Sequence, residues 1–182
     1  NKTESAIYFK MAADKGNHRA MNNYAMKLSK GDGIPQDKKE AFRYMKMAIE
    51  AGKPEYIGNY AFFLEHGKGT EKNPTEAAKY YQIAIEKGDT TSMINYGFML
   101  FRGNGIKENK EEALKYFKLA ADNECLEGMF RYGMIMMGGE GISSNKDEAL
   151  KYLKMAADKG HEQAKIEYPR MLEMKEKGDD YI

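Results

Sequence analysis

The side chains best suited to catalysis or metal binding are few in this sequence, and their spacing does not bring them together. Three histidines lie far apart in the chain: His18, His66 and His161. The pair His161-Glu162 lacks the second histidine of a zinc-binding H-E-x-x-H motif, because Lys165 stands in its place. Cys125 is the single cysteine, which excludes an intramolecular disulfide and a cysteine-based metal cluster within one chain. The residue types therefore predict no enzyme, no cofactor and no metal site.

The composition of the chain indicates which classes of binding partner to expect. Lys and Arg number 29 against 28 Asp and Glu, and the resulting net charge of +1 gives no electrostatic reason to expect nucleic acid. The most apolar stretch, residues 129–137, contains Arg131 and is too short to cross a bilayer. We expect a protein or peptide partner and no membrane insertion. The lone cysteine favours a reducing, cytoplasmic location, with a targeting signal upstream of Asn1 left open.

The elements that could position a binding surface come from an internal repeat of 36 residues. One glycine column contains Gly16, Gly52, Gly88 and Gly160 and is broken by Glu124. A G-x-G pair recurs at Gly31 and Gly33, Gly67 and Gly69, Gly103 and Gly105, and Gly139 and Gly141. Alanine columns are Ala12, Ala48, Ala84, Ala120 and Ala156, and Ala41, Ala77, Ala113 and Ala149. A tyrosine column comprises Tyr24, Tyr60, Tyr96, Tyr132 and Tyr168.

Each period predicts two helices. The second helix begins at a capping box, in which a short polar residue precedes a glutamate by three positions. The polar residues are Asn1, Asp37, Asn73, Asn109 and Asn145, and the glutamates are Glu4, Glu40, Glu76, Glu112 and Glu148. This helix is predicted to stop near the glycine of the first column, such as Gly52. The first helix, from about Lys53 to His66 in one period, ends at the G-x-G pair.

This register predicts the domain organisation. Residues 1–16 form the second helix of a truncated repeat, and residues 17–52, 53–88, 89–124 and 125–160 form full repeats. Residues 161–182 form a terminal helix and polar tail, which Pro169 should kink or shorten. The half repeat indicates a chain cut from a longer protein. It should leave Ile7 and Met11 uncovered, which predicts possible self-association through the uncapped N-terminal helix.

The columns resemble a known family. The string Gly16, Ala20, Tyr24-Ala25, Leu28, Gly31-x-Gly33, Asp37, Ala41, Tyr44, Ala48 is similar to the Sel1-like repeat, a relative of the tetratricopeptide repeat. The resemblance covers essentially the whole chain, although the family's usual Leu-Gly is Tyr-Ala or Tyr-Gly here. It implies an all-α, right-handed α-solenoid of helix-turn-helix repeats that acts as a non-catalytic scaffold or adaptor.

In the related tetratricopeptide fold, one face of each first helix lines a concave groove. The equivalent positions here form a polar column, Asn23, Asn59, Asn95 and Arg131, and an apolar column, Met26, Phe62, Phe98 and Met134. Ile94 and Phe101 lie beside the apolar column, and Arg102 lies on the rim. The asparagines would hydrogen-bond an extended peptide, or alternatively bond between neighbouring helices. The apolar side chains would line the groove, or alternatively pack as core.

Two functions therefore remain open at this point. The first is a protein-interaction scaffold that binds a peptide or protein in the groove, with an acidic or C-terminal carboxylate near Arg102 and Arg131. The second is a regulatory or targeting domain of a larger signalling enzyme, such as a protein kinase.

Overall fold

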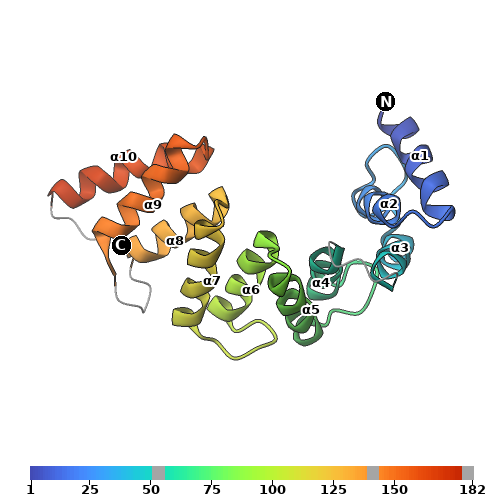
Figure 1. Cartoon of the computed structure of the whole chain (residues 1–182), viewed down its shortest axis with the longest axis horizontal. Coiled ribbons are helices and arrows are strands. Elements are labelled where there is room, and N and C mark those ends of the chain that lie inside the picture. The colour runs from blue at the N-terminus through green and yellow to red at the C-terminus, as the bar shows by residue number, and fades with distance from the viewer. Residues whose placement is uncertain (51–55, 139–143, 178–182) are drawn as a thin grey trace. The chain divides into compact units, whose positions relative to one another are not determined.

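A computed structural model describes residues 1–50, 56–138 and 144–177, and the regular elements in this part of the chain are all helices, without strands. Its helices are α1 (Lys2–Asp14), α2 (His18–Lys30), α3 (Lys38–Glu50), α4 (Ile57–His66), α5 (Pro74–Glu86), α6 (Thr90–Arg102), α7 (Lys110–Asp122), α8 (Leu126–Gly138), α9 (Lys146–Asp158) and α10 (Glu162–Lys177). Figure 1 labels these helices, and their contacts divide the chain into two compact units, Asn1–Asp89 and Thr90–Ile182. The predictions made for Gly52, Lys53, Gly139 and Gly141 fall outside the described residues.

The two helices of each repeat pack against one another most extensively: α2 with α3 and α4 with α5 in the first unit, α6 with α7 and α8 with α9 in the second. Small residues make this close approach possible, since Ala41, Ala77, Ala113 and Ala149 are all fully buried. The tyrosine column meets a second tyrosine twenty positions later. Tyr24 and Tyr44 lie edge to face with ring centroids 4.9 Å apart, and Tyr132 and Tyr152 do so at 4.7 Å.

The predicted N-cap residues are confirmed where the second helices of full repeats begin. The side chain of Asp37 accepts from Glu40 N at 2.9 Å, and the equivalent asparagines accept from Glu76 N, Glu112 N and Glu148 N at 3.0–3.1 Å. Asn1 caps α1 differently, accepting from Thr3 N at 3.0 Å. These bonds satisfy backbone donors that the first helical turn leaves unpaired.

The G-x-G pair has two separate functions. The first glycine ends the helix in the left-handed conformation, as Gly31 does at φ +72°. The second glycine lies against the N-terminal turn of the preceding second helix. A Cβ atom on Gly33 would lie 2.6 Å from Lys2 C, and one on Gly69 would lie 1.7 Å from Lys38 O. The turn therefore requires glycine for space as well as for φ.

Hydrogen bonds also join successive second helices within each unit. The Tyr44 hydroxyl on α3 donates to Asp14 Oδ1 at the end of α1 over 2.7 Å. The Tyr152 hydroxyl on α9 donates to Asp122 Oδ1 at the end of α7 over 2.9 Å. Tyr8 occupies the same column on α1 and is 69% exposed, against 2% for Tyr44. Ile7 and Met11 are exposed as the sequence predicts, whereas self-association through this helix stays a prediction.

Pro169 was predicted to kink or shorten the final helix; the shortening is wrong, and the kink stays a prediction. α10 runs from Glu162 to Lys177 with Pro169 inside it. Proline removes one backbone donor and crowds the carbonyl four residues earlier, which here belongs to Lys165. Both Lys165 and Pro169 are exposed, so water can satisfy that carbonyl and the helix continues.

Glu124 carries local strain that a substitution should relieve. It adopts φ +60°, the one positive φ of a non-glycine residue in the described part of the chain, where its column otherwise has glycine. We expect Glu124→Gly to raise the melting temperature by roughly 2–4 °C, because the left-handed conformation costs a glycine little. The lost ion pair to Lys159, 2.9 Å long with the Glu124 side chain 80% exposed, should contribute little.

The melting temperature followed by circular dichroism measures this effect, and Glu124→Ala is the control. Alanine removes the same ion pair and retains the left-handed strain, so it should give no gain. Equal melting temperatures for the two variants would contradict the strain argument.

Candidate functional site

A concave surface that brings together residues of two first helices lies in the second unit, between α6 and α8. It is a hollow of about 280 Å³. The lining residues are Phe98, Phe101 and Arg102 from α6, and Phe130, Arg131, Met134 and Ile135 from α8. On α6 the three side chains share a face because they are three and four positions apart. Five of the residues predicted for the groove, Phe98, Phe101, Arg102, Arg131 and Met134, therefore meet at one place.

Two guanidinium groups lie over the aromatic wall of this hollow. Arg102 lies 5.2 Å from the ring centroid of Phe98. Arg131 lies 5.3 Å from Phe98 and 5.3 Å from Phe130. The rings attract both cations through their π faces. The hollow thus combines an apolar interior with a positively charged border.

Arg131 is held in place by an acidic neighbour. Its Nε donates to Glu127 Oε1 over 2.6 Å, and Glu127 Oε2 lies 3.1 Å from His161 Nε2. Burial raises the pKa of Glu127, but the hydrogen bonds from His161 and Arg131 outweigh burial and hold the pKa below its ordinary value. Glu127 therefore stays ionised and neutralises much of the Arg131 charge.

His161 is a site neighbour that the sequence did not identify. Its ring stacks on Phe130 with centroids 4.7 Å apart, and its Nδ1 accepts from Ala164 N at 3.2 Å. With Nδ1 an acceptor, Nε2 carries the proton and donates to Glu127. The available signal was position, since His161 immediately precedes a first helix and can cap it while covering the previous one.

Other predicted groove residues of the second unit lie elsewhere. Ile94 is 5% exposed and does not line the hollow, which favours the core alternative for this residue. Asn95 is half-buried, and its side chain makes no hydrogen bond to any described residue.

The first unit presents different chemistry at the equivalent positions. Asn59 Nδ2 donates to Asn22 Oδ1 over 2.9 Å, and Asn22 Nδ2 donates to Asn23 Oδ1 over 3.3 Å. Two predicted peptide-binding asparagines, Asn23 and Asn59, therefore belong to an amide chain that joins α2 and α4, the helix-linking alternative. One amide atom remains on each, Nδ2 of Asn23 and Oδ1 of Asn59.

The apolar column of the first unit is half-exposed. Met26 and Phe62 are both partly buried. The ring of Phe62 lies 4.3 Å from that of His66 and 4.5 Å from the ammonium group of Lys68.

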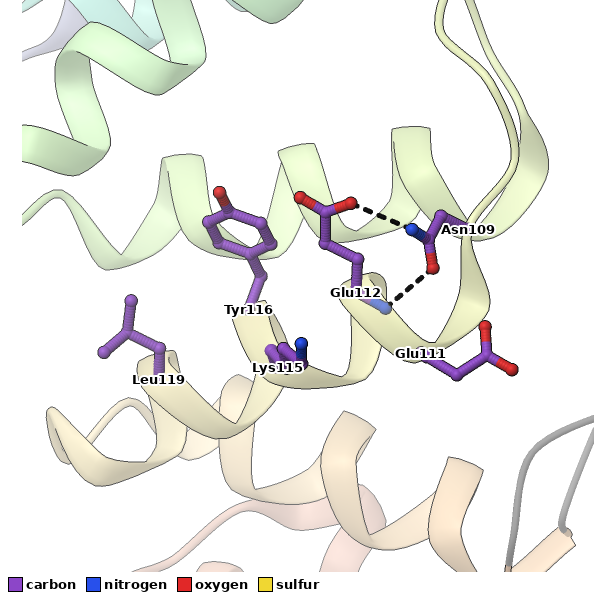
Figure 2. A pocket seen from close by; sticks show the side chains of 6 residues that line it. All are labelled: Asn109, Glu111, Glu112, Lys115, Tyr116 and Leu119. Carbon is purple, nitrogen blue, oxygen red and sulfur yellow. Dashed lines mark hydrogen bonds between the residues drawn. The ribbon is translucent and has the colours of Figure 1, made fainter.

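A second kind of hollow lies on the second helices. Figure 2 shows it on α7, lined by Asn109, Glu111, Glu112, Lys115, Tyr116 and Leu119. The same repeat columns line a hollow on α5: Asn73, Thr75, Glu76, Lys79, Tyr80 and Ile83. Asn109 and Glu112 already bond one another at 3.0 Å through both side chain and backbone. We interpret this hollow as a product of the capping box and repeat spacing.

The described residues contain neither a candidate metal site nor a candidate membrane-spanning helix. Among them, no three His, Cys, Asp or Glu side chains are grouped so as to hold a metal ion. Of the helices described, none is both long enough and apolar enough to cross a membrane.

The helix pairs, their tight glycine turns and their common register define an all-α helix-pair repeat protein. The family model described as the Sel1 repeat matches residues 1–17, 18–53, 56–89, 90–125 and 126–161. The chain belongs to the Sel1 repeat family, whose arrays generally serve as non-catalytic protein-interaction scaffolds. A search of the curated proteins finds no match.

Solved structures show the same solenoid fold at low identity. A Sel1 repeat protein from Oxalobacter formigenes has a TM-score of 0.79 and 24% identity, with 98% of this chain and 80% of that chain covered. A protective antigen of uropathogenic Escherichia coli has a TM-score of 0.74 and 21% identity over 99% of this chain and 38% of its own. An immunity protein from Pseudomonas aeruginosa has a TM-score of 0.61 and 20% identity, covering 87% and 59%.

Proposed function

We propose that this chain is a scaffold or adaptor that binds a protein or peptide through its first-helix faces, with the α6–α8 hollow as the main contact. The observation that supports this most is the hollow itself, where half-exposed Phe98, Phe101 and Met134 lie together between two arginines. Exposed apolar surface bordered by polar groups is typical of interaction sites, and aromatic and arginine side chains dominate binding energy there.

Asn95 and the spare amide atoms of Asn23 and Asn59 are secondary contacts in this proposal. An amide donor and acceptor can bond a peptide backbone without selecting its sequence. The cytoplasmic location belongs to the same proposal. Nothing in the comparisons favours the second candidate, a regulatory domain of a signalling enzyme.

Capture of partners from a native extract tests the proposal. The double variant Phe101→Ser and Met134→Ser removes two half-exposed apolar side chains and should reduce captured protein about tenfold or more. The column of Phe101 already contains Ser29, so serine is compatible with the helix. Quantitative mass spectrometry of the retained proteins gives the readout.

The matched control is Leu119→Ser with Met155→Ser, which removes two apolar side chains from the second helices of the same unit. This control should capture as much protein as the unmodified chain, and circular dichroism should show equal helix content. Equal capture by the first-helix variant would remove the proposed face from consideration.

A further inference from the structure

The α6–α8 hollow selects its ligand by charge as well as by shape, and this inference rests on the proposed function. We infer that it binds an acidic peptide segment, placing one large apolar side chain in the hollow and a neighbouring carboxylate on Arg102. The occupant is a peptide or exposed protein segment that carries Phe, Leu, Met or Tyr within one helical turn of Asp or Glu.

The walls of the hollow are apolar and suit a large apolar side chain. Phe98, Phe101 and Met134 are half-exposed there, and Phe130 and Ile135 form the buried floor. The volume of about 280 Å³ lies at the lower limit of ordinary small-molecule sites, which span roughly 300–1,000 Å³. A space of this size suits a side chain or two of a peptide.

The selection for charge comes from the two arginines, which differ in whether an acidic side chain pairs with them. Arg131 is paired with Glu127 at 2.6 Å, so its charge is largely compensated. Arg102 is exposed and has no ion pair with any residue in the described ranges. Its guanidinium group lies over Phe98, at the border of the hollow. The border therefore retains one positive charge, and a carboxylate is the group that guanidinium binds most strongly in two parallel hydrogen bonds.

The first unit does not repeat this combination. At the positions of Phe101, Arg102 and Phe130 it has Ser29, Lys30 and Gly58. The three phenylalanines of the hollow are replaced there, with one ring, Phe62, at the position of Met134, and Asn59, bonded to Asn22, takes the place of Arg131. The acidic-apolar specificity should belong to the second unit alone.

Selection from a displayed library of random short peptides, using the whole 182-residue chain as bait, tests this inference. We expect the enriched peptides to combine a large apolar residue with Asp or Glu within one helical turn. Charge reversal in Arg102→Glu should weaken such peptides roughly tenfold or more and enrich Lys or Arg in their place. Arg19→Glu on α2, which makes the same charge change on the first unit, should leave the selected peptides unchanged.

Phe101→Ser distinguishes failure of the charge inference from failure of the proposed function. If the enriched peptides are apolar but neutral or basic, and Phe101→Ser still weakens them, the charge inference fails and the proposed function stands. If Phe101→Ser leaves binding unchanged, or no peptide is enriched, both fail. Acidic-apolar peptides that lose affinity in both Phe101→Ser and Arg102→Glu support the inference.

Discussion

Gly69→Ala is expected to destabilise the first unit by about 3 kcal/mol or more. The left-handed conformation of this residue, φ +76°, costs an L-residue about 1–2 kcal/mol. The new Cβ would also lie 1.7 Å from Lys38 O and 2.3 Å from Lys38 C. These are backbone atoms at the start of α3, so no side-chain rotation relieves the overlap, and overpacking of this kind costs about 1–3 kcal/mol more.

Gly88→Ala is the matched control for this experiment. Gly88 has nearly the same backbone conformation, φ +82°, but a Cβ there meets no atom within 4 Å. The control should lose only the conformational part, about 1–2 kcal/mol. Urea denaturation followed by circular dichroism gives both values. Equal losses would show that the turn tolerates a side chain and that glycine is needed there for φ alone.

Phe117→Ala is expected to cost about 3–5 kcal/mol in the second unit. The ring is fully buried on α7. Its centroid lies 5.1 Å from that of Phe98, and its Cε1 lies 2.9 Å from the place where a Cβ of Gly97 would be. Truncation leaves a cavity that the helix pair α6–α7 cannot close without moving Phe98, a wall of the hollow. Peptide affinity should therefore fall together with stability.

Leu119→Ala, on the same helix, provides the control. Leu119 is 42% exposed, so its truncation should change stability by less than about 1 kcal/mol and leave peptide affinity intact. Thermal melting and a peptide titration on both variants measure the two effects. Equal melting temperatures for Phe117→Ala and Leu119→Ala would show that the helix pair α6–α7 packs loosely at Phe117.

The fold was predictable from the sequence because each repeat carries the same signals for helix starts and helix ends. Capping residues such as Asn109 and Glu112 identify helix starts, and glycine pairs such as Gly67 and Gly69 identify helix ends. The exception is Pro169, because the expectation that proline shortens a helix did not account for exposure of the affected carbonyl. The effect of a proline on a helix depends on whether the backbone there is buried or exposed, and the spacing of residues in the sequence does not reveal this.

The candidate site was only partly predictable. Spacing places Phe98, Phe101 and Arg102 on one face, but Ile94, one turn earlier, is buried. Ile94 shares its column with Phe130, whose ring stacks on His161, the residue just before the next first helix. Whether a column is groove or core thus depends on the following repeat. Asn59 bonds to Asn22 on the neighbouring first helix. The repeat spacing cannot predict whether an asparagine side chain bonds to such a neighbour or stays available for a ligand.

The contact between the second turn glycine and the backbone of the preceding repeat has an evolutionary consequence. Gly33 against Lys2 and Gly69 against Lys38 fix the distance between repeats through main-chain atoms, which every sequence shares. First-helix side chains are then free to diverge, as Ser29 and Phe101 have done at equivalent positions. New binding specificities can arise by drift on such a surface while the spacing of the array is conserved.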